Sequence, residues 1–216
     1  MQELFSYFEA EKAKKLENYR QLNRYVRKGQ ILFTGSSLME QFPISEYCAD
    51  FLPGKIVYNR GIGGYTSDDF LKAADVILLA PEPARIFLNI GTNDIHPRDD
   101  GRDWLTLLSD NYRSILTLCR DRLPDSEIHI MAFYPVNEDV GRASGNPVFQ
   151  VRTNRNIRRA NACLQMLAKE YGVSFLDANS GLTDENGNLC EFFTMDGIHM
   201  YASAYRIVFE NIKKYL

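Results

Sequence analysis

Residues 85–94 read RIFLNIGTND, a run that is apolar almost throughout and then ends in Gly91-Thr92-Asn93-Asp94. A strand with one solvent-exposed face alternates apolar and polar residues, and residues 85–90 do not alternate. The run therefore predicts a parallel strand that is covered on both faces. The polar residues that follow it lie at the carboxyl end of that strand, which is the edge where open α/β sheets bind their ligands.

Working outward, four similar runs occur at residues 31–34, 56–58, 128–133 and 173–176. Helix-length stretches with apolar residues at steps of three and four lie at 67–79, 103–122 and 153–170, with a last one at 201–215. This alternation predicts an α/β fold: a three-layer, doubly wound, five-stranded parallel sheet. We expect the flavodoxin-like strand order 2-1-3-4-5, which the alternation by itself does not fix. A further helix over about 1–28 is expected to pack on the domain edge, as an N-terminal extension of a single domain spanning 1–216.

The composition of the chain excludes several classes of protein. The chain has 216 residues, with 25 Lys+Arg and 28 Asp+Glu, which gives a formal charge of −3. A nucleic-acid binder needs a basic excess, so no nucleic-acid partner is expected. The longest strongly apolar run, residues 76–80, is far shorter than the roughly 20 residues of a transmembrane segment. No basic segment precedes an apolar stretch, so a cytoplasmic location is expected. The four cysteines show no metal-ligand spacing, which predicts reduced thiols and no metal site.

Three more polar segments adjoin the predicted elements. They are residues 35–38 (GSSL) after the first strand, 59–64 (NRGIGG) after the second, and 196–199 (DGIH) before the last helix. With the strand order given above, Ser37 and Asn93 face each other across the crevice, with Gly64 beside them. The chain has three histidines, so a reaction that needs an imidazole base has only His96, His129 and His199 to use.

These segments, together with residues 91–94, resemble in order the sequence blocks of the SGNH hydrolases, also called GDSL-type esterases and lipases. The resemblance runs from about residue 30 to the C-terminus. It implies a Ser37, His199 and Asp196 triad, with an oxyanion hole made by the N–H groups of Ser37 and Gly64 and the amide of Asn93. It implies no cofactor. Ser36 and Tyr65 stand where members of the family often carry aspartate.

The residue chemistry agrees with those roles. A serine hydroxyl is a poor nucleophile unless a base takes its proton, and an aspartate three residues before the histidine can orient the imidazole. The expected activity is that of a serine esterase or acylhydrolase, which cleaves a carboxylic ester of a small molecule, carbohydrate or lysolipid through an acyl-enzyme. Two alternatives stay open: an acyl-thioesterase with the same triad, and a non-catalytic ligand-binding protein on the same fold. A homo-oligomer is also possible.

Several residues have a second interpretation. Ser37 can simply cap a short helix. The glycines of 61–64 suggest a dinucleotide-binding loop, but Thr66 occupies the position of its last glycine. The side chains of Tyr65, His96 and Tyr134, with the irregular segment 135–147, are expected to shape the substrate pocket or to be rim packing. Asp94 is expected to close a local turn.

Overall fold

The computed structural model describes residues 2–97 and 101–216, with the side chains of the first helix described from residue 6 onward. Its strands form one parallel sheet in the order β2-β1-β3-β4-β5, which confirms the predicted topology. The strands are β1 (Ile31–Gly35), β2 (Val57–Asn59), β3 (Arg85–Asn89), β4 (Glu127–Met131) and β5 (Ser174–Leu176).

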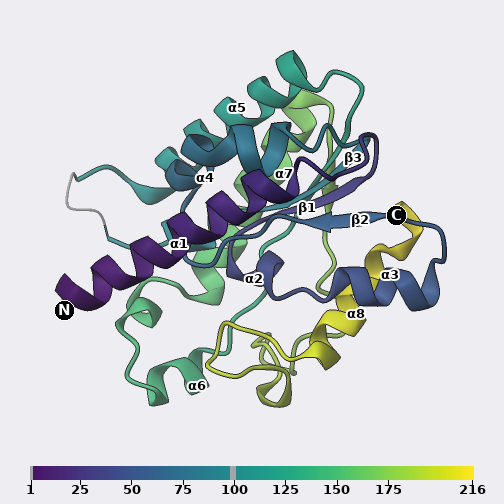
Figure 1. Ribbon diagram of the computed structural model, residues 1–216. Helices are drawn as coiled ribbons and strands as arrows, with labels where there is room; N and C mark the ends of the chain where they lie inside the picture. The colour runs from purple at the N-terminus through teal and green to yellow at the C-terminus, as the bar shows by residue number, and fades with distance from the viewer. Residues whose placement is uncertain (1, 98–100) are drawn as a thin grey trace.

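Helices cover both faces of this sheet (Figure 1). One face carries α1 (Gln2–Leu22), α4 (Ser67–Ala74), α5 (Trp104–Arg122) and α7 (Asn154–Tyr171), and the other carries α3 (Ile44–Phe51) and α8 (Ala202–Ile212). Each face has its own apolar cluster. In β1, Leu32 belongs to one cluster, whereas Ile31 and Phe33 belong to the other. Successive strand residues point to opposite faces, so a strand buried on both sides is apolar throughout.

The helix expected over 67–79 is divided. α4 starts as a capping box, in which the Asp69 N–H donates to the Thr66 hydroxyl (3.2 Å) and the Thr66 N–H donates to the Asp69 carboxylate (3.1 Å). The α-helix ends at Ala74, and residues 75–79 form one π-helical turn. The start was readable because it depends on a local side-chain pattern. The change of winding at Ala74 has no such signal.

The segment 135–147 was expected to be irregular, and the structure places a short helix in it. This helix, α6 (Glu138–Ala143), begins at Asn137, whose side-chain oxygen accepts a hydrogen bond from the N–H of Val140 (3.0 Å). Asparagine is a preferred N-cap, so the same residue that suggested a loop instead starts a helix.

The first helix ends at Leu22, before the expected boundary near residue 28. Beyond it, Asn23 bonds across to the rest of the fold: its amide donates to the Val76 carbonyl (2.7 Å) and its oxygen accepts from Arg60 (3.0 Å). One turn earlier, the Tyr19 hydroxyl donates to the Gly61 carbonyl (2.8 Å). α1 is therefore fastened to the loop that follows β2, which is one of the predicted site loops.

Candidate active site

Ser37 is the first residue of α2 (Ser37–Glu40), directly beyond β1. The chain turns there at Gly35, where an added Cβ would lie 1.9 Å from the carbonyl oxygen of Asn89 at the end of β3. Only glycine permits this approach of the two strand ends. The side chain of Asn59 then ties α2 to the next loop, since its amide donates to Met39 O (2.5 Å) and its oxygen accepts from Gly61 N (2.9 Å).

The structure brings Ser37, His199 and Asp196 into one hydrogen-bonded line. His199 Nε2 lies 2.9 Å from Ser37 Oγ, although the two residues are 162 positions apart. His199 Nδ1 lies 2.7 Å from Asp196 Oδ2. The imidazole therefore bridges a hydroxyl and a carboxylate, which is the geometry a serine needs to lose its proton.

The turn that carries Asp196 and His199 is held by its own hydrogen bonds. Asp196 Oδ1 accepts from the N–H groups of Ile198 (2.9 Å) and His199 (2.8 Å). The Thr194 hydroxyl donates to the His199 carbonyl (2.9 Å) and accepts from the N–H of Gly197 (2.8 Å). The carboxylate and the imidazole are thus oriented before any ligand binds.

The electrostatics of this turn favour an ionised carboxylate. Partial burial raises the pKa of Asp196, but hydrogen bonds from His199 and from the Ile198 N–H outweigh it and lower the pKa to about 2. A carboxylate that stays charged keeps the proton of the imidazole on Nδ1, so that Nε2 is free to accept a proton from Ser37.

Three groups at or near Ser37 have an N–H that forms no hydrogen bond with another described residue. No described residue accepts from the N–H of Ser37 or of Gly64. Asn93 uses one amide hydrogen to bond the Tyr65 carbonyl (3.0 Å), which orients its side chain and leaves the other hydrogen available. Ser37, Gly64, Asn93 and His199 all line one pocket of about 860 Å³. The arrangement offers N–H groups to an anionic oxygen bound next to the Ser37 hydroxyl.

The three residues predicted to shape the substrate pocket are not among the described residues that line it. Tyr65 is buried and contributes its carbonyl to Asn93. His96 lies one turn beyond, with Nδ1 2.8 Å from the Asn93 carbonyl. Tyr134 is 1% exposed and belongs to the apolar cluster on the α8 face, so its assignment to the pocket needs correction. Tyr134 follows β4, and its side chain turned to the core because that face is covered by α8.

Asp94 does more than close a local turn. It is fully buried, and its carboxylate accepts from both the N–H (2.9 Å) and the hydroxyl (2.6 Å) of Ser67 at the start of α4. Burial raises the pKa of Asp94, against the hydrogen bonds from Ser67. Asn111 in turn donates to the Ser67 hydroxyl (2.8 Å). This buried network fixes the loop that carries Asn93.

The sequence did not indicate that α1 forms part of this pocket. Phe8, Lys12 and Lys15 of α1 line it together with Ser37, and α1 passes close to the start of α2 (Figure 1). Lys15 pairs with Glu40, which also accepts from the N–H of Gly63. α1 is therefore a wall of the candidate site. No pattern within α1 itself points to this contact, because it depends on where the helix docks.

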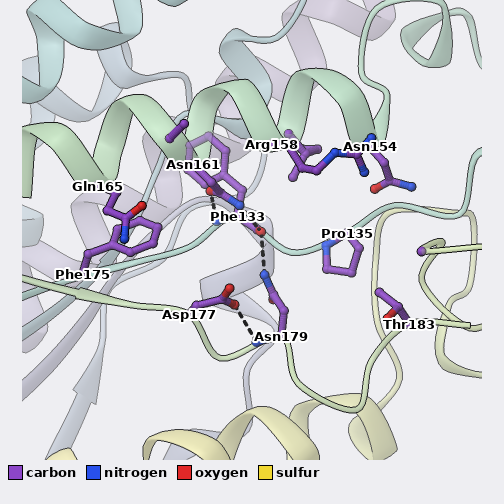
Figure 2. A pocket seen from close by; sticks show the side chains of 13 residues that line it. Phe133, Pro135, Asn154, Arg158, Asn161, Gln165, Phe175, Asp177, Asn179 and Thr183 are labelled. Atoms are coloured by element: carbon purple, nitrogen blue, oxygen red, sulfur yellow. Dashed lines mark hydrogen bonds between the residues drawn. The ribbon is translucent and has the colours of Figure 1, made fainter.

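A second pocket, of about 530 Å³, lies between α7 and the segments that follow β4 and β5 (Figure 2). Two of the side-chain amides that line it already donate hydrogen bonds to the protein backbone. Asn161 and Asn179 both donate to the Phe133 carbonyl, at 3.0 and 3.1 Å, and both point at it in Figure 2. These side chains brace the backbone after β4. Pro135, from the segment 135–147, lines this pocket, but none of the predicted triad or oxyanion-hole residues does.

Two observations concern the part of the chain that the structure describes, residues 2–97 and 101–216. No helix there is long and apolar enough to cross a membrane. In the same part of the chain, no three His, Cys, Asp or Glu side chains converge as metal ligands. The four cysteines form no disulfide, and two of them, Cys48 and Cys119, are buried.

Comparison with known proteins gives a consistent picture. The family model of GDSL-like lipases and acylhydrolases matches residues 34–207. A Streptococcus pneumoniae structure, provisionally assigned as a platelet activating factor, is 32% identical over 99% of this chain and 96% of its own, with a TM-score of 0.87. Two others share the fold: a GDSL-like lipase from Bacteroides thetaiotaomicron (22% identity, 93% and 96% coverage, TM-score 0.74) and an acetylxylan esterase from Geobacillus stearothermophilus (14%, 88% and 94%, 0.67). No curated protein matches the sequence.

Proposed function

The chain belongs to the GDSL-like lipase/acylhydrolase family, and from this premise we propose that it is a serine esterase that works through an acyl-enzyme. The observation that carries the proposal is the line of contacts from Ser37 Oγ to His199 Nε2 (2.9 Å) and from His199 Nδ1 to Asp196 (2.7 Å). A protein that only binds a ligand has no need of a base aligned with a hydroxyl.

In the first half of the reaction, Ser37 Oγ attacks the ester carbonyl carbon while its proton passes to His199 Nε2. The carbonyl oxygen gains the negative charge, and the N–H groups of Ser37 and Gly64 with the Asn93 amide donate to it. The bond to the alcohol oxygen then breaks, and the leaving alkoxide takes the proton from His199. The products are the free alcohol and an acyl ester on Ser37.

In the second half, water replaces the alcohol. His199 takes a proton from the water as its oxygen bonds to the acyl carbon, and the same donors hold the new oxyanion. The Oγ–carbon bond breaks, Ser37 regains its proton from His199, and the acid is released. Asp196 keeps its negative charge throughout and stabilises the imidazolium that forms twice in each cycle.

The pocket bears on substrate size. A volume of about 860 Å³ falls within the range of pockets that hold small organic ligands. It supports an ester of a small molecule, a sugar or a single-chain lipid, and the acetylxylan esterase with the same fold acts on an acetylated carbohydrate. A thioester is the alternative substrate, since the triad is the same and only the leaving atom differs.

The test is covalent labelling. We expect a fluorophosphonate to add once to the wild-type protein, with the added mass on the peptide that contains Ser37. Ser37→Ala should abolish labelling and hydrolysis of p-nitrophenyl acetate, whereas Ser36→Ala should retain most of both. Labelling that survives Ser37→Ala and is lost in Ser36→Ala would move the nucleophile by one residue. A folded wild-type protein that takes no label would favour the ligand-binding alternative, and a parallel acyl-thioester assay separates the two hydrolases.

A further inference from the structure

Lys12 of α1 stands directly over the glycine proposed for the oxyanion hole. A Cβ built on Gly64 would lie 3.0 Å from Lys12 Cε and 3.4 Å from Lys12 Nζ. Both residues line the pocket that contains Ser37 and His199. The ammonium group is therefore close to the place where an ester carbonyl would bind, although α1 precedes residues 34–207, which the family model matches.

Three lysines of α1 line this pocket, and each pairs with a carboxylate: Lys14 is 72% exposed and pairs with Glu11 at 2.8 Å. Lys15 pairs with Glu40, which is itself fixed by the N–H of Gly63. Lys12 pairs with Glu9, three residues earlier on the same helix, at 2.7 Å. The Lys12 side chain is 22% exposed and that of Glu9 is 47% exposed. An exposed pair at this spacing on a helix is weak, so Glu9 is an easily replaced partner.

The surroundings of Lys12 favour a stronger partner than Glu9. Lys12 is less exposed than Glu9, so an anion that reaches it from inside the pocket is less screened than the Glu9 carboxylate. Phe8 and Ile62 line the pocket, as do Glu11 and Glu40, whose charges are balanced by Lys14 and Lys15. Tyr19 and Asn23 fasten α1, and with it the backbone of Lys12, to the loop after β2. An ammonium group beside the place where an ester carbonyl would bind has the chemistry to bind an anion.

We propose that Lys12 binds an anionic group of the substrate, a carboxylate, phosphate or sulfonate, and so selects esters that carry a negative charge near the scissile bond. This inference rests on the proposed esterase function and adds the substrate class. Lys12 takes no part in proton transfer. It positions the substrate, and the anion displaces Glu9 from the ammonium.

The experiment compares Lys12→Gln with Arg20→Gln, a variant of the same helix with the same loss of charge. Arg20 pairs with Glu17 on the exposed surface of α1 and does not line the pocket. Each protein is assayed with neutral p-nitrophenyl butyrate, with the p-nitrophenyl monoester of glutaric acid, and with 4-acetoxybenzenesulfonate. The second substrate carries its charge on the acyl side and the third on the leaving group, so they also show which side Lys12 faces.

We expect Lys12→Gln to lower kcat/KM for at least one anionic ester by about 10–100-fold, chiefly through KM, because a charge-assisted contact is lost. Hydrolysis of the neutral ester should stay within about twofold, and Lys12→Arg should restore the preference. Arg20→Gln should behave like wild type.

Other results would overturn the inference. An equal loss for neutral and anionic esters would show that Lys12 acts on the carbonyl oxygen, and no loss for either anionic ester would show that it binds no anion. An Arg20→Gln effect of the same size would show that the preference for anionic esters arises from the overall charge of α1 and not from Lys12. These outcomes leave the esterase proposal standing, whereas a wild-type protein that hydrolyses none of the three esters would remove that proposal and this inference together.

Discussion

The backbone N–H of Asn137 donates a 2.8 Å hydrogen bond to the carbonyl oxygen of Gly197. The segment after β4 thereby supports the turn that places His199 against Ser37. The two segments approach closely at this point, since a Cβ at Gly197 would lie 2.7 Å from the Asn137 carbonyl oxygen and 2.9 Å from the Gly141 nitrogen. The geometry of the proposed base thus depends on a loop that carries none of the reacting groups.

Gly197→Ala should therefore impair both stability and turnover. Gly197 has φ +93°, which an L-residue rarely adopts, and the new methyl group would press on backbone atoms that cannot rotate away. We expect a lower Tm and a fall in kcat of at least tenfold, measured by thermal unfolding and ester hydrolysis. Gly145→Ala is the control, because Gly145 also has positive φ (+72°) but no atom lies within 4 Å of its added Cβ. Equal effects on kcat in the two variants would show that the Asn137 contact does not position His199.

Asn93→Ala should lower kcat by about 10²–10³-fold while KM changes little, because the proposed contact is made to charge that develops in the transition state. The Tyr65 carbonyl already orients the amide, so little ordering is needed on binding. Steady-state kinetics with p-nitrophenyl acetate measure both constants. Asn186→Ala, on an exposed loop, should leave them unchanged. A rise in KM alone would make Asn93 a ground-state binding residue.

The fold should lose stability in strong acid as Asp196 takes up a proton. Against the partial burial that raises it, hydrogen bonds from His199 and from the Ile198 N–H lower the pKa of Asp196 to about 2 in the folded protein. The unfolded carboxyl has a higher pKa, so these hydrogen bonds stabilise the fold above about pH 4, and this contribution is lost as the pH falls toward 2. Thermal unfolding should therefore show Tm falling as the pH is lowered from about 4 toward 2. A Tm that stays level over this range would contradict the stabilising role of the Asp196 carboxylate.

Asp94→Asn should destabilise the protein without removing the proposed reacting groups. The NH2 group that replaces one carboxylate oxygen cannot accept a hydrogen bond, so either the N–H or the hydroxyl of Ser67 loses its acceptor in a fully buried site. A buried donor left without a partner costs about 1–3 kcal/mol, which lowers Tm by roughly 2–12 °C in a protein of this size. Asp110→Asn, on the exposed side of α5, should leave Tm within a degree or so. Equal Tm values for Asp94→Asn and wild type would show that the hydrogen bonds of this network do not stabilise the fold.

Much of the fold was predictable because it depends on local patterns. Unbroken apolar runs marked strands covered on both faces, and β3 with its polar end at Asn93 is the clearest of them. The Thr66 and Asp69 capping box marked the start of α4. Given the strand order, the parallel strands had to bring their carboxyl ends to one edge, so Ser37 and Asn93 were expected to face the same crevice.

Other features depended on contacts that no single segment specifies. An amphipathic pattern shows that one face of α1 is covered, but it does not say by what. The docking through Tyr19 and Asn23 decided that Lys12 lies over Gly64. Likewise, the identity of Asp94 suggested a turn, and only the position of Ser67 made it the acceptor of a buried network.

The amino-acid sequence thus determined the strands of the sheet, the start of α4 and the residue types at the edge of the sheet, because periodicity and turn chemistry act over a few neighbouring positions. The tertiary structure decided which side chains meet: the 2.9 Å approach of His199 to Ser37 across 162 residues, and the place of α1 as a wall of the pocket. Such long-range contacts are set by the packing of whole helices and strands on one another. A local sequence pattern does not specify which surface an element will contact.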